Sequence, residues 1–487
     1  MLVRLRKTLS ILILVALFSC KKDLPFYDNS DVQLIFSEDT VIFDTVFTTV
    51  GSVTKLFKVK NPYSQPVLIN RIYIAGGKDS DFRINVDGAS GNYHEDVEIR
   101  AKDSIYVFVE VTVDPNNQTN PMIITDSVIF EINGKMFDVD LVAWGQDAYF
   151  YPLTIFEAGN SYTLANDKPH VFYGWAVVDS SACLILQEGT RLHFHKGSGI
   201  LVYKDACIKS LGTVENPVII QGDRLEYDYY DVPNQWERIW LSATSRDNVF
   251  QNTIIKNANV GIQVDSVGTT QEGLPTLTLI NTKIENMSGV GLLAQGSEVV
   301  AVNSVFANCG LYCAALIYGG SYEFIHCTFA NYWSHSARDN GLLLLNNYYE
   351  SVNKQIVVRD LTKADFKNCI VYGNKDEEIE LDKDASGTFN YLFSYCLLKT
   401  QQNTSSANFN NITANPSQVT VDGNSHDPVF QDYENYNYQL FDQSAALNKG
   451  NASYTNLLLN YTSSTNDIKD NPRSDGAPDL GAYEYIP

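Results

Sequence analysis

The sequence predicts an all-β protein in two parts, an N-terminal immunoglobulin-like β-sandwich followed by a right-handed parallel β-helix. Three observations lead to this fold class. The 487 residues are 44% hydrophobic and 12% aromatic, with 29 Tyr, 24 Phe and only 4 Met, a composition that favours strands. Turn residues recur at short intervals before residue 148, and a repeat with a period in the low twenties follows.

The charge balance excludes one class of partner. Lys and Arg total 35 and Asp and Glu total 57, so the formal net charge is 35 − 57 = −22. An acidic chain of this kind repels phosphate backbones, so we expect no nucleic-acid partner.

The first segment has the pattern of an export signal with a lipid anchor. A positively charged start precedes an apolar core at residues 11–18, which is too short to span a bilayer. Residues 17–20, Leu-Phe-Ser-Cys, resemble a bacterial lipobox, which implies cleavage before Cys20 and its acylation, palmitate included. Residues 21–23, Lys-Lys-Asp, resemble the export signal of surface lipoproteins in Bacteroidota, so we expect an outer-membrane protein that faces the cell exterior. The alternative is an ordinary secretory signal with an incidental cysteine.

The remaining cysteines are expected to be small buried hydrophobic residues. Their number is odd, so they cannot form a complete disulfide framework, and no Cys-x-x-Cys pair suggests a zinc site. They are Cys183, Cys207, Cys309, Cys313, Cys327, Cys369 and Cys396.

Residues 32–148 carry short β-branched and aromatic runs separated by turn clusters. This regular spacing is typical of an immunoglobulin-like sandwich. The strongest local signal is the hairpin turn Asn133-Gly134. Residues 57–62, Phe-Lys-Val-Lys-Asn-Pro, followed by Val-Leu-Ile at 67–69, resemble the Hydin-like β-sandwich modules, which implies a spacer or binding module without catalysis.

A six-residue segment that recurs with a period in the low twenties predicts the second part. Each copy alternates inward apolar and outward polar residues and then bends at Asn or Gly, because Asn tolerates the left-handed conformation. Stacked copies form a parallel β-helix with ladders of Asn or Cys, and we expect about eleven coils between residues 150 and 400. The interval of 42 residues between the copies at 326 and 368 is expected to hold two turns. The copies start at Asn252, Asn281, Asn303, His326, Asn368 and Tyr395.

Further motifs resemble the secreted right-handed β-helix proteins of the pectate-lyase-like superfamily. They include Gly-Thr-Val-Glu-Asn-Pro-Val at 212–218, Asp-Pro-Val-Phe at 427–430 and Pro-Asp-Leu-Gly-Ala-Tyr-Glu-Tyr at 478–485. The resemblance implies the architecture but not an activity, since one fold hosts unrelated functions. The predicted division is a signal peptide at 1–19, a lipidated tether at 20–31, the sandwich at 32–148, the β-helix at 149–400 and C-terminal coils with a cap at 401–487.

No catalytic set known from that superfamily is recognisable. The acidic run at 376–380 is expected to be a solvated edge; it leaves calcium open as a cofactor, and otherwise we expect none. His193 and His195 share one face of a strand, but no third ligand is visible, so we expect a polar face and no metal site. Arg338 or Arg359 could serve as a lyase base, yet nothing near them completes a site. We therefore expect no catalytic residues.

The candidate ligand or partner surface is an aromatic loop, because rings beside carboxylates hold sugars or protein partners. The alternative for this loop is a packed lid with Trp236 and Trp240 inside. Its candidate residues are Tyr227, Tyr229, Tyr230 and Trp236.

Near the C-terminus, charged residues are expected to cap the open end of the solenoid rather than to catalyse. They are Arg473, Asp475, Asp479 and Glu484.

These patterns predict a non-enzymatic, surface-exposed outer-membrane lipoprotein that presents a β-helix face to a partner. That partner is an envelope complex, such as one with an outer-membrane β-barrel or other lipoproteins, or a polysaccharide. A polysaccharide lyase or glycoside hydrolase acting on acidic glycans is the alternative, which rests on fold analogy alone. An adhesin is the second alternative.

Overall fold

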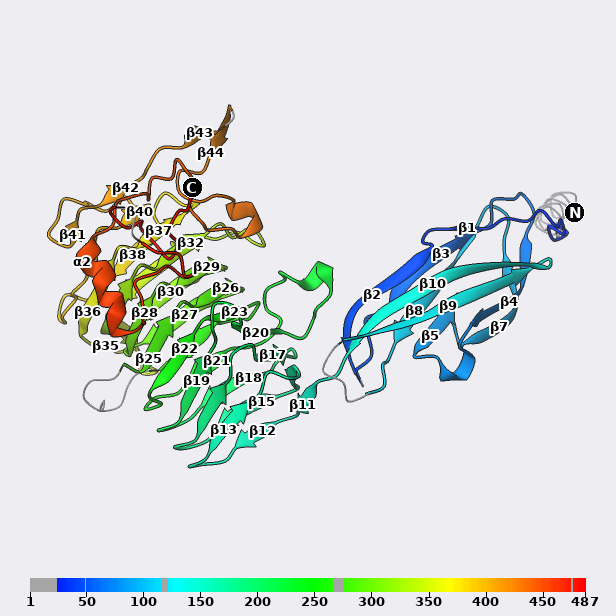
Figure 1. The fold of residues 1–487 in the computed structure, drawn as a ribbon, viewed down its shortest axis with the longest axis horizontal. Coiled ribbons are helices and arrows are strands. Elements are labelled where there is room, and N and C mark those ends of the chain that lie inside the picture. Colours follow the sequence, from blue (N-terminus) through cyan, green and yellow to red (C-terminus); the bar gives the residue numbers. More distant parts are fainter. Residues whose placement is uncertain (1–23, 49, 116–120, 266–274, 422, 474–475) are drawn as a thin grey trace, which may run out of the picture. The chain divides into compact units, whose positions relative to one another are not determined.

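A computed structural model describes residues 24–48, 50–115, 121–265, 275–421, 423–473 and 476–487 (Figure 1). The lipobox with Cys20 and the charged residue Asp475 lie outside the described residues. The chain divides into two compact units between Asp147 and Ala148.

The first unit consists of two five-stranded sheets around one core. All strand pairs are antiparallel except that of β2 with β10, which is parallel. The core contains Phe57, Phe130 and Val107, all fully buried. One sheet has the order β1 (Ile35–Phe36), β3 (Lys55–Lys60), β8 (Ser104–Val111), β5 (Phe82–Val86) and β6 (Ala89–Ser90). The other has the order β2 (Thr40–Phe47), β10 (Lys135–Gln146), β9 (Met122–Ile132), β4 (Val67–Ile74) and β7 (Tyr93–Ile99).

The hairpin predicted at Asn133-Gly134 is confirmed. Ile132 of β9 pairs with Lys135 of β10, so only two residues form the loop. Asn133 and Gly134 have φ angles of 48° and 77°, as a two-residue turn of type I′ requires at both positions.

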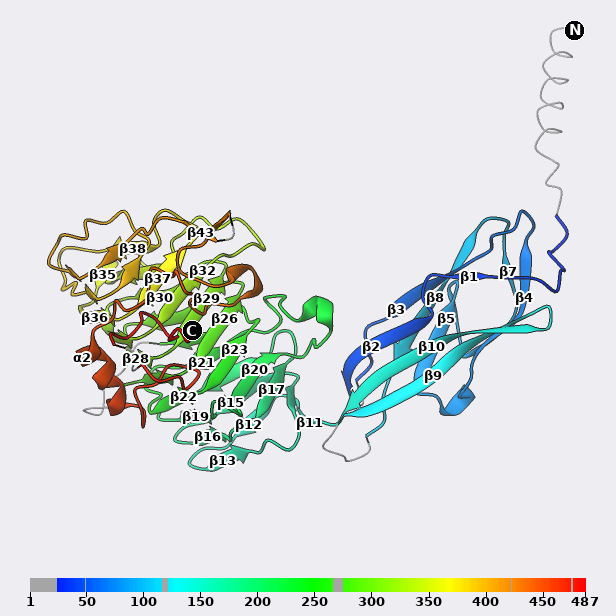
Figure 2. The same ribbon diagram turned by 45° about the horizontal axis from the view of Figure 1, so that its top comes forward.

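The second unit is a parallel β-helix, as predicted, built from three long sheets of parallel strands (Figure 2). The eleven-stranded sheet comprises β11 (Tyr149–Tyr151), β14 (His170–Phe172), β17 (Arg191–Phe194), β20 (Val218–Gly222), β23 (Thr253–Lys256), β26 (Lys283–Met287), β29 (Val305–Cys309), β32 (Thr328–Asn331), β37 (Ile370–Gly373), β40 (Leu397–Leu398) and β42 (Thr413–Ala414). The nine-stranded sheet comprises β12 (Thr154–Phe156), β15 (Trp175–Val178), β18 (Gly199–Val202), β21 (Ile239–Leu241), β24 (Ile262–Val264), β27 (Val290–Gln295), β30 (Tyr312–Ile317), β33 (Leu343–Asn346) and β38 (Ile379–Asp382). The ten-stranded sheet comprises β13 (Ser161–Leu164), β16 (Cys183–Leu186), β19 (Cys207–Leu211), β22 (Asn248–Gln251), β25 (Leu277–Ile280), β28 (Glu298–Val302), β31 (Gly320–Ile325), β36 (Leu361–Lys367), β39 (Leu392–Ser394) and β41 (Phe409–Asn410).

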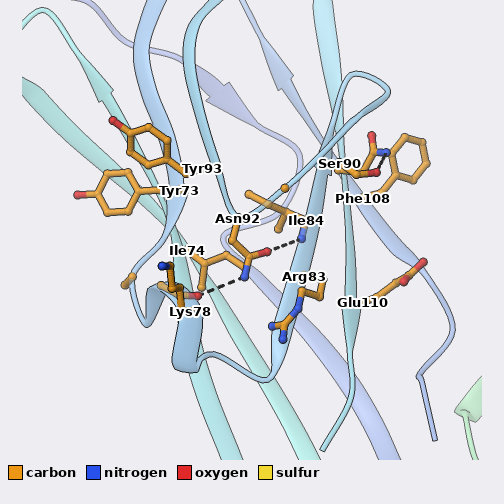
Figure 3. A pocket seen from close by; sticks show the side chains of 14 residues that line it. Tyr73, Ile74, Lys78, Arg83, Ile84, Ser90, Asn92, Tyr93, Phe108 and Glu110 are labelled. Atoms are coloured by element: carbon orange, nitrogen blue, oxygen red, sulfur yellow. Dashed lines mark hydrogen bonds between the residues drawn. The ribbon is translucent and has the colours of Figure 1, made fainter.

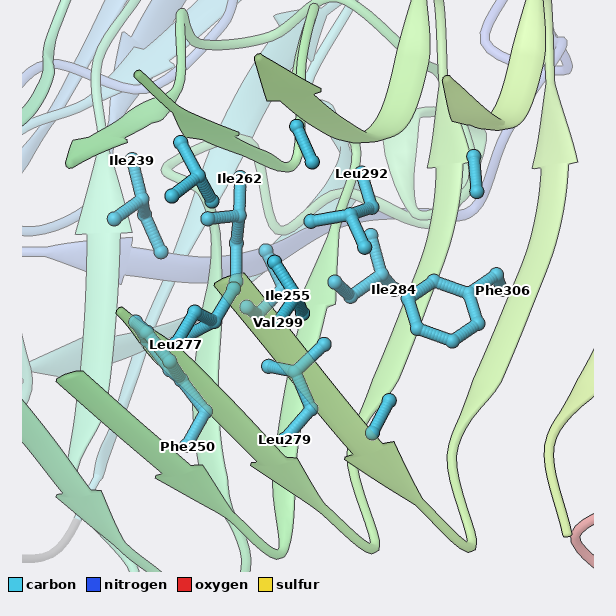
Figure 4. Close-up of a cluster of buried hydrophobic side chains, with 14 of the residues drawn as sticks. Ile239, Phe250, Ile255, Ile262, Leu277, Leu279, Ile284, Leu292, Val299 and Phe306 are labelled. Atoms are coloured by element: carbon cyan, nitrogen blue, oxygen red, sulfur yellow. The ribbon is translucent and has the colours of Figure 1, made fainter. Parts of the chain in front are cut away.

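Alternate side chains of each strand point inward and fill one continuous core. Figure 4 shows Ile255, Ile284 and Phe306, from three successive strands of the eleven-stranded sheet, pointing into the space that the sheets enclose. Because the side chains of a strand alternate in direction, their neighbours in sequence point to the outer face.

The predicted asparagine bends are present. All six repeat starts have positive φ, between 44° at Asn252 and 53° at Tyr395. The Asn281 Nδ2 donates to Asn252 Oδ1 at 3.1 Å, so the side chains of successive coils form a ladder. The bend that precedes each strand formed by a repeat copy is therefore fixed by the residue type in the repeat.

The interval of 42 residues holds one coil, so the prediction of two turns was wrong. Thr328 of β32 pairs directly with Ile370 of β37, with no strand between them. The extra length lies partly in an antiparallel hairpin of β34 (Tyr348–Glu350) and β35 (Ile356–Val358). A long interval between copies does not distinguish a second turn from a side insertion.

Two cysteines differ from the prediction. Cys183 and Cys207 occupy paired positions on β16 and β19 and form a disulfide between adjacent coils. The other cysteines that the structure describes are free and buried, as expected. Cys327, Cys369 and Cys396 each follow a repeat start and donate a thiol to a carbonyl oxygen of the preceding coil.

The C-terminal segment covers the side of the solenoid, so the prediction of an end cap was wrong. Its apolar residues, among them Phe430 and Leu480, cluster with outward residues of β29, β32, β37 and β40. Arg473 and Glu484, both buried, form an ion pair of 2.8 Å, and Arg473 Nη2 also donates to Asn303 Oδ1 at 3.3 Å. Asp479 accepts the Asn448 backbone N–H at 2.7 Å. Arg473 therefore attaches the segment to a middle coil, while the ion pair and Asp479 hold the segment together.

Candidate binding face

The aromatic loop contains the short helix η2 (Tyr227–Tyr229) and presents three of its four candidate residues to solvent. Tyr227 is 87% exposed. The Arg224 guanidinium lies 3.7 Å from the centroid of the Tyr229 ring, and Lys256 Nζ lies 3.2 Å from that of Tyr230. Cation–π contacts of this kind orient both rings.

The fourth candidate, Trp236, belongs to the core. It is 1% exposed, stacks on Phe194 at 4.8 Å and donates its indole N–H to the Lys256 carbonyl at 2.9 Å. Trp240, by contrast, points outward. The sequence alone does not show whether a single aromatic residue at the end of a loop points into the core or toward solvent.

The acidic run at 376–380 is not a solvated edge. Glu378 is buried and forms a two-pronged ion pair with Arg338, with both N–O distances 2.7 Å. Glu377 accepts the Thr400 hydroxyl at 2.8 Å, and Glu380 accepts the Tyr312 hydroxyl at 3.0 Å. These carboxylates and Arg338 therefore have structural partners. Arg359, the other predicted base, is exposed beyond β35, 5.5 Å from the ring of Tyr349.

The histidine pair also differs from the expected polar face. His193 is buried, and this burial lowers the pKa of its imidazole to about 4, so it is neutral at pH 7. His195 is exposed and lies 2.7 Å from the Asp223 carboxylate. The two rings therefore sit in different environments.

A column of outward side chains runs along the nine-stranded sheet. Val177, Leu201 and Trp240 occupy one column in successive coils, since they pair in register and lie between core residues. The column continues through Gln263, Leu293, Ala315 and Leu344. Apolar and aromatic side chains therefore line up along the helix axis at the spacing of one coil, about 4.8 Å.

A second tryptophan packs against a glycine on the same face. Trp175 pairs with Gly199 of the next coil. A Cβ atom at Gly199 would lie 3.0 Å from Cζ3 and 3.1 Å from Cη2 of the Trp175 indole. The indole thus lies over the glycine, where any other residue would displace it.

A chain of polar side chains fixes Trp240. Its indole N–H donates to Asp265 Oδ2 at 2.7 Å, and Gln263 Nε2 donates to Asp265 Oδ1 at 2.9 Å. Arg238 Nη1 donates to Gln263 Oε1 at 2.6 Å. Two aromatic residues and a hydrogen-bonded polar row therefore share one face, an arrangement that can stack with and hydrogen-bond a hydroxylated ligand.

This face was not among the predicted sites, although part of its signal is in the sequence. Alternation around Ile239 and Leu241 places Arg238 and Trp240 together, and alternation around Ile262 places the later polar residues on a common face. The register of Trp240 with Gln263 depends on a turn whose length the sequence does not specify.

Two pockets lie elsewhere. One, of 890 Å³, is on the first unit, where Tyr73 and Tyr93 point away from Phe108 and Glu110, with Asn92 between them (Figure 3). The side chains that line this pocket do not point toward a common centre. The other, of 500 Å³, is lined by residues 425–437, of which His426 is one.

Within the described ranges, no three His, Cys, Asp or Glu side chains are placed to hold a metal ion. No helix in the described part of the chain is long and apolar enough to cross a membrane.

Comparison with known proteins supports the fold. The family model of the right-handed β-helix region matches residues 159–329, so the second unit is a right-handed parallel β-helix. No curated protein matches the chain.

Two solved structures show slight similarity. One is a family 123 glycoside hydrolase from Clostridium perfringens, with 9% identity, a TM-score of 0.17 and coverage of 23% of this chain. The match spans about a quarter of that hydrolase, 26%. The other is the catalytic domain of Agl-KA, with 11% identity, a TM-score of 0.21 and coverage of 73% of this chain and 79% of that one.

Proposed function

We propose that this protein is a non-enzymatic binding protein that holds an extended, neutral glycan along the outer face of the nine-stranded sheet. The observation that carries the proposal is the pair of oriented indoles, Trp175 and Trp240, beside the polar row of Arg238, Gln263 and Asp265. Sugar rings stack on aromatic faces through their apolar sides, while amide and carboxylate groups bond to hydroxyls.

The geometry of the solenoid suits a chain rather than a single sugar. Each coil advances about 4.8 Å along the axis, which is close to the advance of one residue in an extended glycan. The indole of Trp175 covers the β18 coil, and that of Trp240 reaches toward Asp265 in the coil after its own. Both indoles can therefore stack with sugars of the same chain.

The charges on this face favour a neutral ligand. Glu237 lies 3.9 Å from Arg238, and Asp265 is linked to Arg238 through Gln263. A uronate polymer would meet these carboxylates, and the overall charge of −22, without a compensating basic surface.

The engagement of the charged candidates favours binding over catalysis. Arg338 is paired with Glu378, and Arg473 with Glu484, and all four side chains are buried. A lyase or hydrolase needs a base or acid that reaches the substrate. Of the two bases that the sequence suggested, Arg338 is therefore occupied and Arg359 alone is exposed, which leaves the alternative of an enzyme acting on acidic glycans with that one residue.

We further propose that the protein is exported and anchored in the outer membrane through Cys20, facing the cell exterior, with the first unit as an immunoglobulin-like spacer. The disulfide between Cys183 and Cys207 supports export, because such bonds persist in oxidising compartments. In this position the glycan could belong to the cell envelope, to a partner complex or, for an adhesin, to another surface.

Calorimetric titration with neutral and uronate hexasaccharides, followed by analysis of the sugars, tests the proposal. We expect saturable binding of a neutral chain and unchanged sugars after prolonged incubation. Preferential binding of uronates, or the appearance of shortened or unsaturated products, would contradict it.

A further inference from the structure

The first unit has a sheet face on which apolar and basic side chains lie side by side. Phe57 and Val59 of β3 are fully buried in the core of the sandwich. Because the side chains of a strand alternate in direction, Leu56, Lys58 and Lys60 point to the outer face. Leu56 is 48% exposed, and both lysines are exposed as well. This strand therefore presents one apolar and two cationic side chains to solvent.

The neighbouring strands extend this surface. On β8, Tyr106 lies opposite Lys58 and Phe108 lies opposite Leu56. On β1, Ile35 lies opposite the last residue of β3. Ile35 is 52% exposed and Tyr106 is 39% exposed. Adjacent exposed apolar side chains of this size mark an interaction surface. We call the following six residues the docking face: Ile35, Leu56, Lys58, Lys60, Tyr106 and Phe108.

The charge of the docking face is opposite in sign to that of the chain. Its charged residues are two lysines, whereas the whole chain has a net charge of −22. Lys58 Nζ lies 5.1 Å from the centroid of the Tyr106 ring, within the range of a cation–π contact. Acidic residues lie at its border, since Asp87 follows β5, Asp103 precedes β8, and Glu110 near the end of β8 accepts a hydroxyl hydrogen bond at 2.6 Å. The centre of the face therefore attracts an anionic surface that the rest of the chain repels.

The docking face begins near the point where the chain attaches to the first unit. The ring of Tyr27 stacks on that of Tyr63 at 3.7 Å, and the Tyr27 N–H donates to the Pro66 carbonyl at 2.8 Å. Tyr63 follows Lys60 by three residues. From Cys20 to Tyr27 there are 27 − 20 = 7 residue steps, which span at most about 25 Å. An acylated Cys20 therefore keeps this end of the unit close to the membrane surface.

The reach of the anchor matches the size of the docking face. The strand β8 has eight residues, which corresponds to a length of about 27 Å. The whole face therefore lies within a distance of the membrane that the connecting residues permit. Leu24 and Phe26, which lie between the anchor and Tyr27, are apolar and exposed as well. A membrane surface would bury these side chains together with those of the docking face.

We infer that the docking face binds the surface of a lipid bilayer with anionic headgroups and so orients the first unit on the membrane. Lys58 and Lys60 contact the headgroup phosphates, while Ile35, Leu56 and the tyrosine ring enter the boundary between headgroups and acyl chains. The inference rests on the proposed anchor at Cys20, which supplies the proximity. It goes beyond that anchor, because it names the protein surface that the membrane contacts.

Vesicle flotation tests the inference on the chain from Lys21 onward, which has no acyl chain. The probes are vesicles of phosphatidylcholine alone and of an equal mixture of phosphatidylcholine and phosphatidylglycerol. We expect the protein to partition onto the mixed vesicles and more weakly onto the neutral ones. Each lysine at an anionic surface is worth about fivefold, so the double variant Lys58→Gln with Lys60→Gln should partition at least about tenfold more weakly. Leu56→Ser should weaken the partition about threefold, because less apolar surface is buried.

Two controls separate the docking face from other effects. The double variant Lys196→Gln with Lys204→Gln makes the same change of charge at two exposed lysines of the second unit and should leave the partition unchanged. Mass spectrometry of the N-terminal peptide from cells that make the protein reports the acylation of Cys20 independently. A failure of the proposed anchor is therefore distinguishable from a failure of the docking face.

The inference is overturned if the mixed vesicles bind no more protein than the neutral ones. It is also overturned if the lysine double variant and Leu56→Ser, both folded by circular dichroism, partition as the natural protein does. A dimer in analytical ultracentrifugation that Leu56→Ser abolishes would place a second copy of the chain on the docking face and would overturn the inference as well.

Discussion

Replacing Arg338 by methionine should destabilise the protein strongly, because it leaves a buried carboxylate without its cation. The Arg338 side chain is 2% exposed and that of Glu378 is 0% exposed. Besides the two bonds to Glu378, the guanidinium donates to the Asn340 carbonyl at 3.0 Å and to Asn374 Oδ1 at 2.6 Å. Methionine replaces the apolar stem of the side chain but makes none of these bonds.

The expected cost follows from the loss of one partner of a buried pair, about 3–5 kcal/mol. It depends on pH. Burial already raises the pKa of Glu378, and Arg338 opposes this shift, so the variant should raise that pKa further. A carboxyl with a raised folded pKa gives its full stability below its unfolded pKa of about 4.3 and loses it as the pH rises through the folded value. The loss should therefore be larger at pH 8 than at pH 5.

Urea unfolding followed by tryptophan fluorescence at both pH values measures this loss. The double variant Arg338→Met with Glu378→Leu removes both charges and should recover most of the stability. Arg359→Met, at an exposed arginine, should stay within about 0.5 kcal/mol of the natural protein. A loss below about 1 kcal/mol in Arg338→Met, or a double variant less stable than the single one, would refute the reasoning.

Three further predictions concern stability. His193 has a pKa of about 4 against an ordinary 6.5, so acid favours unfolding, and about 3 kcal/mol of stability should be lost as the pH falls from 6.5 to 4. The variant His193→Gln should flatten this pH dependence in thermal melts at several pH values, and an unchanged slope would contradict the prediction. Phe366→Ala, at a ring stacked between two others, should cost about 3–5 kcal/mol in urea unfolding, whereas the exposed Tyr227→Ala should cost almost nothing; similar losses would contradict the burial. Cys207→Ser removes a disulfide that spans 24 residues and should cost about 3 kcal/mol of stability in non-reducing melts. Reductant should lower the melting temperature of the natural protein only, and an equal response in both proteins would refute this.

The solenoid could be predicted because its determinants are local. Each repeat copy contains its own bend at a residue such as Asn281, and its own alternation of inward and outward residues, so one copy specifies one corner and one strand. The hairpin at Asn133-Gly134 is local in the same way. The insertion of β34 and β35 is not local, because only the pairing of β32 with β37 identifies it.

The site residues were harder to predict, because their environments depend on distant partners. Glu378 is buried in an ion pair with Arg338, which lies 40 residues before it. Because this partner is distant in sequence, the acidic run by itself has the pattern of a solvated edge. The C-terminal segment binds the side of middle coils through contacts such as Arg473 with Asn303, 170 residues apart.

The central proposal is that the nine-stranded face holds a neutral glycan, and one measurement tests it most directly. It compares the affinity of the natural protein and Trp240→Ala for neutral hexasaccharides of the β-glucan, β-mannan and xylan types, with Tyr227→Ala as a control. We predict that at least one of them binds, about tenfold more weakly to Trp240→Ala and equally to Tyr227→Ala. Binding to none of them, or equal binding to all three proteins, would contradict the proposal.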